Sequence, residues 1–150
     1  MRSAILVLAV LAVAAPAFAS DSTDVTAVVK QFIDGFNAGN TQAALATCAP
    51  ETAIIDEFPP YSWNGATGCA DWARDFEGMT KQEGITEPKV TLGKPRHVDV
   101  AGDRAYVVVP ADFKFKVKGK ATAEKGSTLT VALQKLPAGW RMTAWAWAKH

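Results

Sequence analysis

The strongest constraint on the fold of this chain is a long alternation of apolar and polar residues between positions 105 and 117. This two-residue period is typical of a strand with one buried face. A second such strand is predicted around 129–133 and a third over 140–147. A further strand over 88–100 is expected to break near Pro95, because proline cannot join a central ladder. A sheet with a continuous apolar face must be covered by another layer of the protein.

The cover is predicted to come from helices in the first half of the chain. Apolar residues from Val25 to Phe36 recur at helical spacing, which indicates an amphipathic helix over about 24–38. The sequence therefore predicts an α+β fold, a cone-shaped curved antiparallel sheet with about three N-terminal helices packed on its concave face. The other N-terminal elements expected are a short helix at about 43–47, a strand hairpin of 53–55 with 62–64, and a third helix that starts near Gly68.

The N-terminus carries the features of an export signal. Arg2 precedes an uninterrupted apolar run, and Ala17-Phe18-Ala19 fits a small-x-small cleavage site, so that residues 1–19 are predicted to be removed. Residues 20–150 then form one domain, periplasmic or secreted, with no membrane segment after cleavage; an uncleaved membrane anchor is the alternative. Without Arg2, 15 of the 16 basic residues remain against 15 acidic ones. This balance argues against a nucleic-acid partner.

The two cysteines flank the predicted hairpin. Cys48 lies just before its first strand and Cys69 just after its second, and a hairpin brings its own ends together. In an oxidising compartment this favours a disulfide, with two buried free thiols as the alternative. The chain has only two histidines and neither has ligand spacing, so neither a metal site nor another cofactor is predicted.

The order of the predicted helices and strands is similar to that of a known protein superfamily. The helical segment 28–40 is followed by the short apolar strand Ala53-Ile54-Ile55, which ends in the carboxylates Asp56 and Glu57. With the β-rich second half, this order resembles the nuclear transport factor 2-like superfamily, which includes ketosteroid isomerase and the SnoaL-type polyketide cyclases. The resemblance implies a pocket at the open end of the cone. It leaves the function open, since enzymes, binding modules and interaction domains share this scaffold.

The resemblance to ketosteroid isomerase covers roughly residues 25–76 and implies roles for three of them. Glu57 takes the position of the general base, with Asp56 as its neighbour. Adjacent strand residues face opposite ways, so only one of the two is expected to enter the cone. Phe32 stands where the family has its oxyanion-donating tyrosine. Phenylalanine has no hydroxyl group, and the loss of one such donor typically costs about 10²–10³ in rate.

Aromatic residues cluster around the carboxylates and are the candidate ligand contacts. An aromatic wall beside a carboxylate suits a flat apolar ligand or a cationic one, although the same rings can simply close the core of a small domain. The candidate ligand-binding residues are Phe32, Phe58, Tyr61, Trp63, Trp72 and Phe76.

The last predicted strand has apolar residues on both faces. Strict alternation puts Trp145 and Trp147 on one face and Trp140 and Met142 on the other. With helices covering one face of the sheet, a second subunit is the expected cover of the other, which predicts a homodimer.

Two functions compete at this stage. The favoured one is an exported protein that binds a small apolar or aromatic molecule without catalysis. The alternative is an isomerase- or cyclase-like enzyme with Glu57 or Asp56 as general base. An interaction domain with a filled cone is a third reading.

Overall fold

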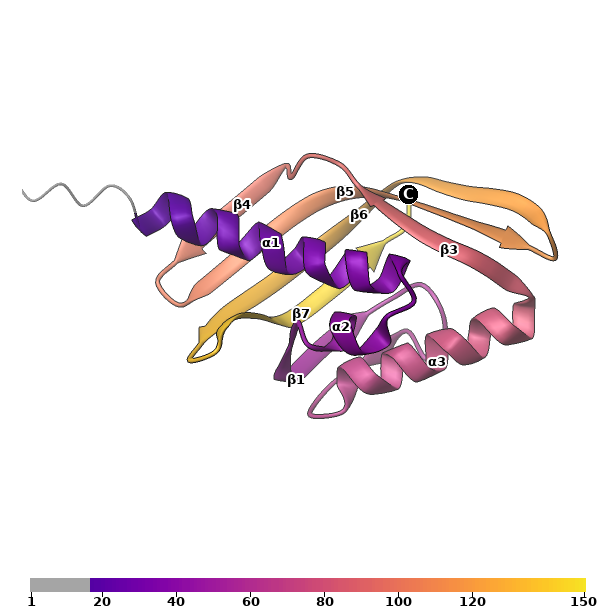
Figure 1. Cartoon of the computed structure of the whole chain (residues 1–150), viewed down its shortest axis with the longest axis horizontal. Helices are drawn as coiled ribbons and strands as arrows, with labels where there is room; N and C mark the ends of the chain where they lie inside the picture. The colour runs from indigo at the N-terminus through magenta and orange to yellow at the C-terminus, as the bar shows by residue number, and fades with distance from the viewer. Residues whose placement is uncertain (1–16) are drawn as a thin grey trace, which may run out of the picture.

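The computed structural model describes residues 17–150 and shows helices packed against a curved sheet (Figure 1). Residues 1–16, which hold most of the predicted export signal, lie outside the described part. No helix in the described part is long and apolar enough to cross a membrane. The helices are α1 (Ala17–Asn37), α2 (Thr41–Leu45) and α3 (Gly68–Glu83); the strands are β1 (Cys48–Ile55), β2 (Ser62–Trp63), β3 (Ile85–Leu92), β4 (His97–Ala101), β5 (Arg104–Val117), β6 (Lys120–Leu136) and β7 (Gly139–Ala148).

The helices lie where their apolar stripes predict. α1 crosses in front of the sheet in Figure 1 and buries Val25, Val29 and Phe32 against it. α2 packs mainly on α1. A Cβ on Gly35 of α1 would lie 2.7 Å from the Ala44 backbone nitrogen, so only glycine permits this close approach of the two helices. Asn40 caps the start of α2, because its side chain accepts a hydrogen bond from the Ala43 amide at 3.0 Å.

The sheet has seven strands, in the order β2-β1-β7-β6-β5-β3, and β4 also pairs with β5. The predicted break between β3 and β4 is confirmed. The sheet is mixed rather than purely antiparallel, because β1 runs parallel to β7. That pairing joins strands from the two halves of the chain, and contacts so remote leave no local pattern in the sequence. The α+β cone is otherwise as predicted.

The predicted Cys48–Cys69 disulfide is confirmed. It joins the start of β1 to the first turn of α3, and the two Cα atoms lie 6.7 Å apart. The hairpin of β1 and β2 brings these positions together through the antiparallel pairs Ile54–Trp63 and Ile55–Ser62. The bond is consistent with an oxidising compartment.

A β-bulge overturns the prediction for the last strand. Met142 pairs with Leu133 of β6 and Ala144 with Ala132, so Thr143 is an extra residue in the ladder. The extra residue reverses the facing of everything after it. Trp140, Met142, Trp145 and Trp147 therefore all belong to the core or pack against it, on one side of the sheet. The opposite face of β7 carries alanines instead, and the exposed tryptophans expected at a dimer interface are absent from it.

Candidate functional site

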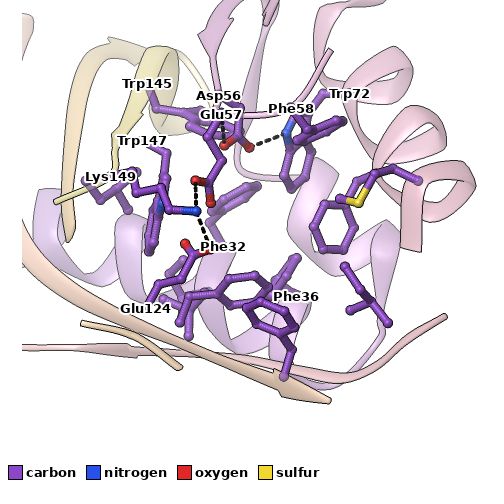
Figure 2. A pocket seen from close by; sticks show the side chains of 18 of the residues that line it. Phe32, Phe36, Asp56, Glu57, Phe58, Trp72, Glu124, Trp145, Trp147 and Lys149 are labelled. Atoms are coloured by element: carbon purple, nitrogen blue, oxygen red, sulfur yellow. Dashed lines mark hydrogen bonds and ion pairs between the residues drawn. The ribbon is translucent and has the colours of Figure 1, made fainter. Parts of the chain in front are cut away.

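A cavity of about 280 Å³ opens between α1, α3 and the sheet (Figure 2). Its wall combines many apolar side chains with a few charged ones. The lining residues are Phe32, Ile33, Phe36, Asp56, Glu57, Phe58, Pro59, Trp72, Phe76, Met79, Glu83, Ile85, Val90, Phe113, Phe115, Glu124, Leu129, Trp145, Trp147 and Lys149. The volume lies near the lower end of the range found for small-molecule sites.

Aromatic rings form a continuous wall along the cavity. The ring of Phe32 lies 5.8 Å from that of Trp72 and 5.6 Å from that of Trp145, measured between ring centroids. Trp72 stacks on Phe76 at 5.6 Å, with 26° between the ring planes. The neighbouring Phe36 meets Phe76 edge-on at 5.2 Å. Rings from α1, α3 and β7 thus present mutually packed apolar surfaces to the cavity.

Four of the six predicted ligand contacts line the cavity: Phe32, Phe58, Trp72 and Phe76. Tyr61 does not, because it follows the Pro59-Pro60 turn with φ 70° and its side chain is 57% exposed. Trp63 is buried outside the cavity. Its ring lies 4.9 Å from that of Phe58, and its Nε1 donates to Asp75 Oδ2 at 2.9 Å. Trp63 therefore packs against the lining residue Phe58 from outside the cavity.

Asp56 and Glu57 both reach the cavity, contrary to the expectation that only one would. β1 ends at Ile55, so the two carboxylates lie in the turn after the strand and do not follow its alternation. Asp56 Oδ2 accepts from Trp72 Nε1 at 2.8 Å, and Oδ1 accepts from the Glu57 amide at 2.7 Å. Burial raises the pKa of Asp56, and these two hydrogen bonds partly offset the rise. Asp56 thereby fixes the orientation of Trp72.

Glu57 belongs to a charged group with Lys149 and Glu124, seen in the centre of Figure 2. Lys149 Nζ lies 2.9 Å from Glu57 Oε2 and 2.6 Å from Glu124 Oε1. Burial, followed by the neighbouring carboxyl of Glu124, raises the pKa of Glu57, and Lys149 opposes that rise. The two carboxylates in turn raise the pKa of Lys149, which keeps it an ammonium ion. A charged lysine of this kind is a poor nucleophile.

Sequence reasoning missed Glu124 and Lys149. Counting back in twos from Leu129 places Glu124 on the outer face of β6. However, two residues of β6 oppose Asp112 alone, between the Ala111–Ser127 and Phe113–Glu124 pairs, and this irregularity turns Glu124 inward. Lys149 continues the facing of Trp145 and Trp147 in steps of two, so the bulge at Thr143 that turned these rings inward also hid Lys149 from sequence reasoning.

The cavity offers few other polar groups. None of its lining residues carries a hydroxyl group. The Nε1 atoms of Trp145 and Trp147 are buried and have no acceptor among the described residues, which leaves two N–H donors in its wall. In the described part of the chain, no group of three His, Cys, Asp or Glu side chains is arranged to hold a metal ion.

Comparison with known families decides the classification. Residues 25–146 match the model of the SnoaL-like domain. The chain belongs to this family. The match spans both the helices and the sheet of the cone, which agrees with the nuclear transport factor 2-like architecture seen in the structure. No curated protein sequence matches the chain significantly.

Several solved structures share the fold of this chain. A nuclear transport factor 2-like superfamily protein from Salmonella enterica serovar Typhimurium is 17% identical, with a TM-score of 0.75 over 89% of this chain and 93% of that one. An NTF2-like protein with a cystatin-like fold from Novosphingobium aromaticivorans is 16% identical, with a TM-score of 0.71 over 88% and 83%. A ketosteroid isomerase-like protein from Erwinia carotovora atroseptica is 16% identical, with a TM-score of 0.68 over 86% and 95%. At these identities the likeness concerns the fold alone.

Proposed function

We propose that this protein is an exported binding protein that holds a small molecule with a flat apolar body in the cone cavity, without catalysing its conversion. The observation that carries the proposal is the cavity of about 280 Å³ with its continuous aromatic wall. An engineered apolar cavity of about 150 Å³ binds benzene, so this one has room for about two fused rings. The predicted signal over residues 1–19 and the Cys48–Cys69 disulfide support export.

The polar groups of the site argue against steroid isomerisation. Phe32, at the position of the family's oxyanion tyrosine, lies in the aromatic wall and is 3% exposed. No lining residue offers a hydroxyl donor to a developing enolate in its place. We therefore expect no appreciable turnover of a Δ5-3-ketosteroid, since a general base alone contributes only about 10²–10⁴.

A second candidate function is general-base catalysis by Glu57. The observation that favours it is the raised pKa of Glu57 at a carboxyl that reaches the cavity, because such perturbation is frequent at catalytic bases. The reaction would be one in which no oxyanion develops next to the carboxylates. A Glu57→Gln variant that binds a substrate but no longer converts it would establish this candidate.

Binding in the cavity can be tested with one substitution placed at two sites. Ile85 lines the cavity, whereas Ile55 is 61% exposed. Tryptophan at Ile85 should narrow the cavity and weaken the binding of an apolar dye such as Nile red about tenfold or more, since overpacking is costly. Tryptophan at Ile55 should leave the affinity unchanged. Equal dye affinity in both variants would show that the dye binds elsewhere and would count against the proposal.

We also propose a homodimer, now through a different set of residues. Val108, Thr130, Ala146 and Ile55 form one row across β5, β6, β7 and β1. The parallel row of Tyr106, Ala132, Ala144 and Ala53 lies beside it. Both rows lie on the face away from the helices. Their mostly apolar side chains, with Ile55 and Tyr106 exposed, form a surface on which a second copy can pack.

A further inference from the structure

The charged end of the cavity is strongly acidic. Among the lining residues Asp56, Glu57, Glu83 and Glu124 are acids, and Lys149 is the one base. An anionic ligand would be repelled by this surplus of carboxylates, and the repulsion grows where protein replaces water. A cationic group would be attracted instead. The charge of the wall thus favours one class of polar group on the ligand.

Lys149 demonstrates which group fits between Glu57 and Glu124. Its ammonium lies within hydrogen-bonding distance of both carboxylates, at 2.9 and 2.6 Å. The Glu124 side chain is only 16% exposed and belongs to the wall, whereas the Lys149 side chain is 54% exposed. The β6–β7 ladder ends at the Thr128–Ala148 pair, so Lys149 lies beyond the last paired residue. The Glu124 carboxylate therefore belongs to the wall, and the ammonium reaches it and Glu57 from a residue beyond the ladder.

The rings near this pair suit the remainder of a cationic ligand. Phe113 and Trp147 line the cavity with their centroids 6.3 Å apart, and Phe113 is directly paired with Glu124 across β5 and β6. An ammonium group is attracted to the face of an aromatic ring, and more strongly when water is excluded. The Glu124 carboxylate, which suits an ammonium group, thus lies beside the rings of Phe113 and Trp147, which suit the apolar body of the same ligand.

We propose that the ligand is an organic primary amine with an aromatic body, and that its ammonium replaces that of Lys149 between Glu57 and Glu124. The tail then acts as a latch that fills the ammonium site when no ligand is bound. Exchange of one ammonium for another leaves the charge of the site and its hydrogen bonds unchanged. The ligand gains in addition the contact of its apolar body with the aromatic wall. This inference rests on the proposed function, because it names the class of ligand that the cavity binds.

The test compares a matched pair of ligands by isothermal titration calorimetry at pH 7 and low salt. 2-Naphthylmethylamine is a cation, and 2-naphthylmethanol has the same body without the charge. Lys149→Met removes the latch, and Lys120→Met is the control at an exposed lysine in the first position of β6. A latch closed about nine-tenths of the time lowers the apparent affinity about tenfold. Lys149→Met should therefore tighten amine binding about tenfold, while alcohol binding and the Lys120→Met control stay within about twofold.

A second variant tests the receiving carboxylate. In the Lys149→Met background, where no latch competes for Glu124, Glu124→Gln should weaken amine binding roughly 10- to 100-fold, as expected for the loss of a hydrogen bond between charged groups, and should spare the alcohol. If Lys149→Met does not fold, NMR spectroscopy of the wild type labelled with ¹³C-lysine can test the exchange instead. The amine, and not the alcohol, should move the Lys149 side-chain signals to the positions of a free lysine.

The outcomes separate this inference from the proposed function. If the alcohol binds but Lys149→Met leaves amine affinity unchanged or weaker, the amine inference is overturned and the cavity remains a binding site. If Lys149→Met improves both ligands equally, the ammonium site is likewise refuted. If neither ligand binds any variant, the proposed function fails and this inference fails with it.

Discussion

Loss of the Cys48–Cys69 disulfide should destabilise the protein by an amount that follows from its loop length. The two cysteines are 21 positions apart in sequence. In the chain-entropy relation, a loop of this size removes about 11 cal/mol/K from the unfolded state, or about 3.3 kcal/mol at 25 °C. Cys48→Ala/Cys69→Ala should therefore lower the free energy of unfolding by about 3 kcal/mol and the melting temperature by roughly 10 °C.

Urea unfolding followed by tryptophan fluorescence measures this change. The oxidised wild type is compared with the double variant and with wild type in dithiothreitol, and the reduced wild type should resemble the double variant. Dithiothreitol should not change the unfolding midpoint of the double variant, which controls for other effects of the reductant. A reduced wild type within about 0.5 kcal/mol of the oxidised one would refute the loop argument. Two reactive thiols in protein purified from its own host would refute the disulfide itself.

Two further predictions concern the bulge in β7 and the charge of Glu57. Ala144→Glu should still fold but shift the sedimentation profile towards monomer. Trp145→Glu should unfold the protein, because Trp145 is 4% exposed and a charge there would be buried. A wild-type protein that sediments as a monomer at about tens of micromolar would contradict the dimer. Since the folded-state pKa of Glu57 is raised, its contribution to stability is fully present below its unfolded-state pKa and is lost as the pH rises through the folded value. Urea unfolding at a series of pH values should show a smaller loss in Glu57→Gln than in the wild type, since the raised pKa of Asp56 remains in the variant. An identical pH dependence in the two proteins would exclude a raised pKa of Glu57.

The architecture was largely predictable because its signals are local. The helical stripe from Val25 to Phe36, the alternation in β5 and the break at Pro95 each reflect a period that neighbouring residues carry by themselves. The disulfide followed from the same reasoning, because a hairpin fixes the distance between its ends. The parallel pairing of β1 with β7 could not be derived in this way, since it depends on where two distant parts of the chain meet.

The candidate site was predicted less completely, and bulges explain most of the difference. One extra residue reverses the facing of all that follow it, so Thr143 brought Trp145 and Trp147 to the cavity side, and the irregularity opposite Asp112 did the same for Glu124. Phe32 and Trp72 were placed correctly because their helices are regular. The ion pair of Glu57 with Lys149 joins the turn after β1 to the residue after β7, and no local sequence pattern predicts a contact between such distant positions.

The most direct test of the central claim, that the cone cavity is an occupied ligand site in the cell, is native mass spectrometry of protein purified from its own host. The account predicts a bound small molecule that is released on denaturation. It should be lost from Ile85→Trp and retained by Ile55→Trp, since only Ile85 lines the cavity. Protein of bare polypeptide mass, together with no dye binding to the wild type, would contradict the account and favour an interaction domain with a filled cone.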